Sequence, residues 1–69
     1  MNKYLVRYIE QEWIDSELLG KRWSTGITGQ TILTLDPFSL EDKYVNTQLN
    51  KGVDLKAKRR TFTDITKLD

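Results

Sequence analysis

The chain has 69 residues and contains neither cysteine nor histidine, and this absence is the strongest constraint on how it can fold. Domains of roughly this size bury only about 60% of their unfolded surface, so many depend on disulfides, a metal or a partner chain. Without Cys, disulfides cannot form, and zinc sites built from Cys and His are excluded. We therefore expect one domain, 1–69, without metal or cofactor, stabilised by its own core or by self-association.

The missing histidine also argues against catalysis. Ser–His and Cys–His nucleophile pairs lack their base. A carboxylate pair could do acid–base chemistry, but a chain of this size has little room for a deep substrate cleft. We expect a binding protein rather than an enzyme, with no catalytic or metal-binding residues.

Apolar runs in the chain are short, such as Tyr4-Leu5-Val6. A membrane span needs roughly 20 apolar residues, and a signal peptide needs an apolar segment that the N-terminus lacks. We expect no membrane association and a cytoplasmic location, which for a viral protein would be the host cytoplasm.

β-branched and aromatic residues are frequent and alanine occurs once, so the composition favours strands. Periodicity predicts, in order, a strand at 3–11, a short helix at 15–22, a strand at 28–35, a helix at 39–50 and a strand at 55–63. The predicted fold class is α+β, with a small antiparallel sheet of two to four strands and the helix at 39–50 packed on one face.

The helix at 39–50 has the clearest pattern. Ser39 and Asp42 resemble a capping box, and Gly52 suits a left-handed cap after the helix. Its apolar stripe would pack on the sheet. In the first strand Tyr4, Val6 and Tyr8 share one face, but we expect the opposite face to be buried. The predicted core is Leu5, Ile9, Trp13, Leu19, Trp23, Ile32, Leu35, Leu40, Tyr44, Leu49, Phe62 and Ile65.

The net charge of +1 conceals two charged segments. A basic segment at 56–60 could neutralise phosphates and release their counterions, which gives a salt-dependent affinity. Alternatively it is a solvated strand edge, or it forms surface ion pairs with the acidic segment at 10–17. The basic residues are Lys56, Lys58, Arg59 and Arg60, and the acidic residues are Glu10, Glu12, Asp15 and Glu17.

Residues 12–32, which include Gly26-Ile27-Thr28-Gly29-Gln30-Thr31-Ile32, resemble the helix-turn-helix of small phage excisionases and related winged-helix regulators. Residues 58–68 are similar to the wing strand and closing helix of that family. The resemblance implies an alternative fold, a winged helix-turn-helix, in which Thr28, Gln30 and Thr31 face the major groove. The competing interpretation is a strand at 28–35, which its β-branched residues favour.

These features predict a small non-enzymatic DNA-binding regulator from a phage or mobile element, with duplex DNA as its partner. Trp13 and Trp23 are interpreted either as core residues or as stacking platforms for bases. One alternative is a protein-binding inhibitor or adaptor that uses the acidic segment or an exposed strand edge. Another is a structural homo-oligomer. The predicted nucleic-acid contacts are Lys21, Arg22, Thr28, Gln30, Thr31, Lys56, Lys58, Arg59 and Arg60.

Overall fold

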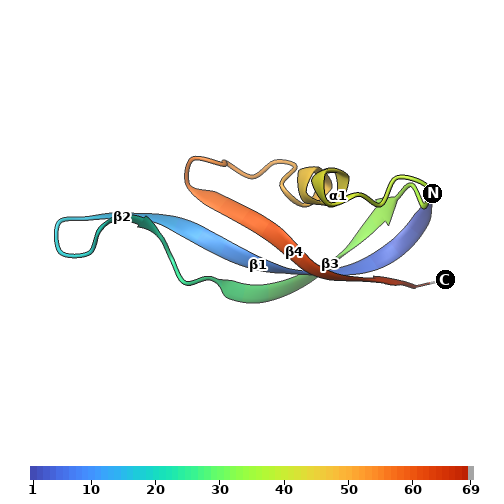
Figure 1. Cartoon of the computed structure of the whole chain (residues 1–69), viewed down its shortest axis with the longest axis horizontal. Helices are drawn as coiled ribbons and strands as arrows, with labels where there is room; N and C mark the ends of the chain where they lie inside the picture. Colours follow the sequence, from blue (N-terminus) through green and yellow to red (C-terminus); the bar gives the residue numbers. More distant parts are fainter. Residues whose placement is uncertain (69) are drawn as a thin grey trace.

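The chain folds around one elongated antiparallel sheet with a short helix on one side (Figure 1). The computed structural model describes residues 1–68. The four-stranded sheet and the helix give an α+β fold, which confirms the predicted class. In chain order the described elements are β1 (Asn2–Ser16), β2 (Gly20–Trp23), β3 (Ile27–Leu35), α1 (Asp42–Leu49) and β4 (Lys58–Lys67).

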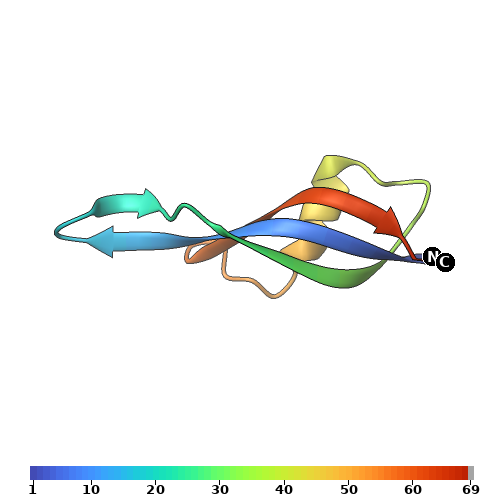
Figure 2. The same cartoon turned by 90° about the horizontal axis from the view of Figure 1, so that it is seen from below.

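The long strand β1 organises the whole molecule, because every other strand pairs with it (Figure 2). Its first part lies between β3 and β4, and its last residues pair with β2. The molecule therefore measures 47 × 17 × 16 Å, with the β1–β2 hairpin projecting beyond the helix-covered part (Figure 1).

The predicted helix at 15–22 is wrong, because these residues form a hairpin turn and its flanking strands. Ser16 pairs with Gly20 across a three-residue loop, and Gly20 has a positive φ of 77°. The Ser16 hydroxyl accepts hydrogen bonds from the backbone N–H groups of Leu18 and Leu19. A serine at such a position is ambiguous in the sequence, since the same hydroxyl can cap a helix or close a turn.

A bulge separates β2 from β3. Trp13 pairs with Trp23 and Glu10 pairs with Ile27, so two residues of β1 face the three residues 24–26. Gly26 has a φ of 95°, and a Cβ there would lie 2.6 Å from Cγ2 of Ile9. Only glycine fits this close approach without displacing β1.

The core lies between α1 and one face of the sheet. Tyr4 and Val6 of β1, Leu35 of β3, and Val45 and Leu49 of α1 are the buried hydrophobic residues of the described part. Alternation along β1 sends even-numbered side chains to this helix side and odd-numbered side chains to the opposite face.

The predicted core is therefore correct on the helix and wrong on most of the sheet. Leu40, Tyr44, Phe62 and Ile65 do pack against the buried cluster, and Leu35 and Leu49 belong to it. The remaining predicted core residues lie outside it, on the uncovered sheet face or in the hairpin loop: Leu5, Ile9, Trp13, Leu19, Trp23 and Ile32.

The ends of the last two elements also differ from the prediction. Helix α1 begins at Asp42 after Glu41, and Ser39 donates its hydroxyl hydrogen to Asp36 instead of capping the helix. Strand β4 begins and ends later than the predicted 55–63 and contains a bulge at Thr63. Gly52 does adopt the predicted left-handed conformation, with a φ of 76°.

No helix among residues 1–68 is long and apolar enough to cross a membrane.

Candidate functional site

The face of the sheet opposite α1 is uncovered, and we call it the open face. Because Val6 on β1 pairs with Thr31 and Ile65 on the helix side, the residues on either side of it point the other way. Ile32 is 59% exposed there. The side chains of the open face include Leu5, Arg7, Ile9, Gln11 and Trp13 of β1, Trp23 of β2, Thr28, Gln30 and Ile32 of β3, and Arg59 and Thr61 of β4.

Two tryptophans and an arginine form a compact cluster on the open face. Trp13 and Trp23 face one another across the β1–β2 pair, with ring centroids 5.3 Å apart in an edge-to-face arrangement. The guanidinium carbon of Arg59 lies 4.3 Å from the centroid of the Trp23 ring. Its Nε donates a 2.7 Å hydrogen bond to Oε1 of Gln11. Residues of three strands thus bring a cation and two indole rings together.

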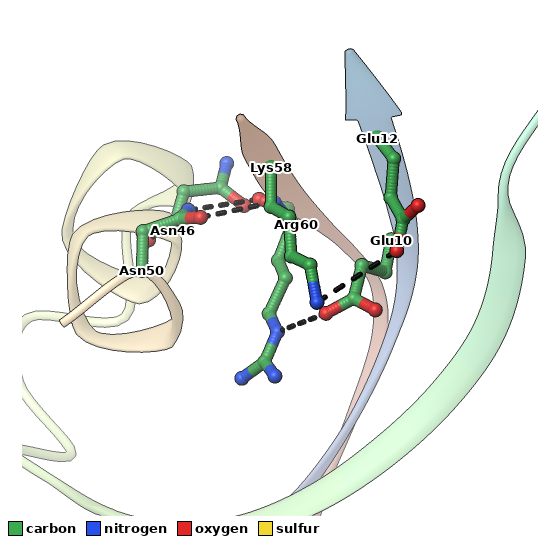
Figure 3. Close-up of polar contacts among 6 residues, drawn as sticks. All are labelled: Glu10, Glu12, Asn46, Asn50, Lys58 and Arg60. Atoms are coloured by element: carbon green, nitrogen blue, oxygen red, sulfur yellow. Dashed lines mark hydrogen bonds and ion pairs between the residues drawn. The ribbon is translucent and has the colours of Figure 1, made fainter. Parts of the chain in front are cut away.

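Two other basic residues of β4, Lys58 and Arg60, lie on the helix side and form ion pairs. The Nε of Arg60 donates a 2.9 Å hydrogen bond to Oε1 of Glu10, and the Nζ of Lys58 lies 3.7 Å from Oε1 of Glu12 (Figure 3). The Arg60 guanidinium carbon is also 4.9 Å from the centroid of the Tyr8 ring. The acidic and basic segments therefore meet across the β1–β4 pair, and two of the expected surface ion pairs form there.

Arg59 differs from its neighbours because it forms no ion pair within residues 1–68. Its Nε is engaged by Gln11 and one face of its guanidinium by Trp23, which leaves its two terminal nitrogens available. An arginine whose side chain is already ordered loses less conformational entropy on binding an anion than a free one.

The middle of the open face contains two of the predicted nucleic-acid contacts. Thr28, Gln30 and Arg7 line a shallow hollow of about 460 Å³, together with Tyr8, Gly29 and Thr63. Hydroxyl, amide and guanidinium groups together supply both hydrogen-bond donors and acceptors. Thr31, by contrast, points to the helix side with Val6, so the structure does not bring it together with Thr28 and Gln30.

The remaining predicted contacts are dispersed. Lys21 lies on the open face of the hairpin across from Asp15, and Arg22 lies on its other side across from Ile14. Lys56 is exposed in the loop before β4. The acidic segment does not form one patch either, because Glu10 and Glu12 are in ion pairs on the helix side and Glu17 is in the hairpin loop.

Arg7 and Gln11 belong to this face but are not among the contacts that the sequence predicts. Each lies at an odd-numbered position of β1, in the same alternation as Trp13. The pairing of Gln11 with Arg59 joins residues 48 positions apart, so only the fold shows it. The alternation is visible in the sequence, but there it predicts a buried face rather than a binding surface.

The chain matches no protein-family model, and neither curated proteins nor solved structures show significant similarity to it.

Proposed function

We propose that the chain is a small non-enzymatic nucleic-acid-binding protein and that the open face of its sheet binds single-stranded nucleic acid. The observation that carries the proposal is the cluster of Trp13, Trp23 and Arg59. It places two indole rings beside an arginine that has no acidic partner among residues 1–68. Exposed aromatic side chains on a sheet surface stack with unpaired bases, and nearby arginines hold the backbone phosphates.

Single strands fit this surface better than the duplex expected from the sequence. Reading a duplex through its major groove takes a helix or a two-stranded ribbon that enters the groove, whereas the middle of the open face spans three paired strands, β3, β1 and β4. Residues 12–32, which the winged-helix alternative requires as two helices, are strands and connecting turns. Trp13 is 41% exposed, so part of its ring is available for stacking.

The charge of the open face also supports an anionic ligand. Its basic side chains are Lys3, Arg7, Lys21 and Arg59, and its acidic side chains are Asp15 and Asp64. The surplus of cations is small, which predicts moderate affinity with a shallow salt dependence. A protein-binding role for the acidic segment has less support, because Glu10 and Glu12 are already paired with cations.

The test is binding to a labelled single-stranded oligonucleotide of about 15 nucleotides, followed by fluorescence anisotropy at several salt concentrations. We expect Trp13→Ala to weaken binding by about 5- to 150-fold, because base stacking on one ring is worth roughly 1–3 kcal/mol. Arg59→Ala should weaken binding. It should also make the negative slope of log K against log salt less steep, by about 0.7 for each phosphate that the arginine neutralises in the wild type.

Two matched variants serve as controls. Phe38→Ala removes an aromatic ring that is 95% exposed in the turn before α1, and Lys56→Ala removes an exposed cation outside the open face. Phe38→Ala should leave affinity unchanged, and Lys56→Ala should change it less than Arg59→Ala. DNA and RNA single strands and the matching duplex are compared in parallel. Tighter binding to the duplex, or equal losses of affinity in the open-face and control variants, would contradict the proposal.

A further inference from the structure

The two outer edges of the sheet differ in how they are protected. Strand β4 is covered by side chains of Asn46 in α1 and of Asn50 just after it, which bond to outward-facing backbone groups of β4. Figure 3 shows both asparagines beside β4. Asn50 accepts from the Arg60 N–H at 2.9 Å and donates to the Arg60 carbonyl at 2.9 Å. Asn46 accepts from the Phe62 N–H at 2.9 Å. These asparagine side chains occupy the positions that a further strand would use.

Strand β3, at the opposite edge, has no such protection. No hydrogen bond within residues 1–68 joins its outward-facing backbone groups to another element. Its nine residues, Ile27–Leu35, contain no charged side chain and no proline. Charged residues, proline and covering elements are the usual devices that prevent an edge strand from pairing with another chain. Strand β3 lacks all three, whereas β4 carries charges and a cover.

We propose that β3 pairs with β3 of a second copy of this chain, in antiparallel orientation across a twofold axis. A twofold dimer brings the same surface of each copy together, so the strand must be compatible with itself. An uncharged strand meets this condition because no like charges become neighbours in any register. A foreign peptide, by contrast, would find no charged side chain on β3 to select it.

The side-chain pattern favours a register centred on Thr31. In that register Thr28 lies opposite Thr34 of the second copy, and Gln30 lies opposite its Ile32, all on the open face. The two copies of Ile32 then become diagonal neighbours and cover apolar surface that is 59% exposed in one chain. The threonines at position 31 face each other on the helix side, where their hydroxyls can form a hydrogen bond.

Self-pairing also compensates for the small size of the core. The buried cluster consists of Tyr4, Val6, Leu35, Val45 and Leu49, which is little for a domain of this length. Pairing at β3 converts an edge strand into an interior one and satisfies its free backbone groups. It also joins two open faces into one surface.

The first test measures the mass of the chain by sedimentation at low and high concentration, without nucleic acid. The double variant Thr28→Lys and Thr34→Lys places like charges opposite each other in the proposed dimer. The matched control, Thr61→Lys with Thr66→Lys, adds the same charges at exposed open-face positions of β4. We expect the wild type and the control to dimerise with rising concentration and the β3 variant to raise the dimer Kd at least about tenfold.

The second test uses the absence of native cysteine. Thr31→Cys places one thiol beside the twofold axis, where facing residues in an antiparallel pair have Cα atoms about 4.5–5.5 Å apart, within disulfide range. Under mild oxidation it should form a covalent dimer faster than Thr61→Cys on β4.

Three results would overturn the proposal: a wild-type monomer at both concentrations, equal effects of the β3 and β4 lysine pairs, or equal cross-linking of the two cysteine variants. Since these assays contain no nucleic acid, they succeed or fail independently of the proposed function. Near-ultraviolet circular dichroism of the two tryptophans verifies that each variant keeps the native fold.

Discussion

At the scale of single residues, Asn50 at the C-terminal end of α1 joins the helix to β4 by hydrogen bonds. Its amide forms two hydrogen bonds with the backbone of Arg60, and its Nδ2 also donates to the carbonyl of Asn46 at 2.7 Å. Amide groups have both a donor and an acceptor, which is why asparagine can imitate a neighbouring strand here.

Replacing this amide should destabilise the fold. We expect Asn50→Ala to lower the free energy of unfolding by about 1–3 kcal/mol, since it leaves the N–H and C=O groups of Arg60 without partners in a half-buried position. Urea denaturation measures the change, with Gln48→Ala on the same helix as the control. Equal destabilisation in the two variants would show that the backbone of β4 does not depend on this amide.

Gly29 provides a second residue-scale prediction. A Cβ at this position would lie 2.8 Å from Cε2 and Cζ of the Tyr8 ring, which is itself held beneath Arg60. We expect Gly29→Ala to cost about 1–3 kcal/mol, because the ring must move away from its packed position.

A double-mutant cycle identifies the ring as the cause. In the background Tyr8→Leu, where the ring is absent, Gly29→Ala should cost much less. The same destabilisation in both backgrounds would point instead to the backbone at residue 29. Thermal or urea denaturation of the four proteins supplies the comparison.

At the scale of elements, the sequence predicts strands more reliably than their boundaries. Alternation of strand-forming residues correctly locates β3 and most of β1. It fails at 15–22, where the spacing of Leu18, Leu19 and Trp23 looks helical although Gly20 closes a hairpin. Phe62 and Ile65 are likewise three positions apart, and the bulge in β4 is what returns both to the helix side. Local periodicity cannot distinguish a helix turn from a strand with an extra residue.

The β1–β2 hairpin is the element we expect to open most easily. It extends past the residues that α1 covers, and Leu18 at its tip is 91% exposed. Its two tryptophans pack on each other, and none of its residues belongs to the buried cluster. Regions with few buried contacts open with a smaller free energy than the core.

Amide hydrogen exchange can measure this difference. We expect the hydrogen-bonded amides of residues 13–16 and 20–23 to exchange at least about tenfold faster than those of residues 4–8, which lie over the buried cluster. Uniform protection along β1 would mean that the hairpin and the core unfold as one unit. Adding the single-stranded oligonucleotide should slow exchange in the hairpin selectively.

At the scale of the whole molecule, the key property is that one face of the sheet is covered and the other is not. The α+β class follows from the composition and from the amphipathic helix. The choice between the two faces of β1 does not, because both carry large side chains that can be buried: Tyr4, Val6 and Tyr8 on one face, and Leu5, Ile9 and Trp13 on the other. One helix can cover only one face, and which one it covers is decided by tertiary contacts such as those of Val45 and Leu49. The candidate site is therefore concealed among residues that the sequence suggests are core.

Electrostatics at this scale also depends on the fold. The segments at 10–17 and 56–60 are separated along the chain, but antiparallel pairing of β1 with β4 places Glu10 opposite Arg60 and Glu12 opposite Lys58. This register leaves Arg59 on the other face, beside Trp23. Lys58 and Arg60 are thus paired with carboxylates, whereas Arg59 remains available for a ligand. Counting charges along the sequence does not show which of these cations is paired.

The central claim is that the open face binds single-stranded nucleic acid, and titration followed by two-dimensional ¹H–¹⁵N NMR tests it most directly. The chain has two tryptophans, so two indole N–H signals report on the proposed site. We predict that both indole signals and the amides around Arg7, Gln30 and Arg59 shift together on adding an oligonucleotide, while the exposed side of α1 stays unchanged. Shifts confined to α1 and the loop at 51–57, or no shifts at millimolar oligonucleotide, would contradict the account.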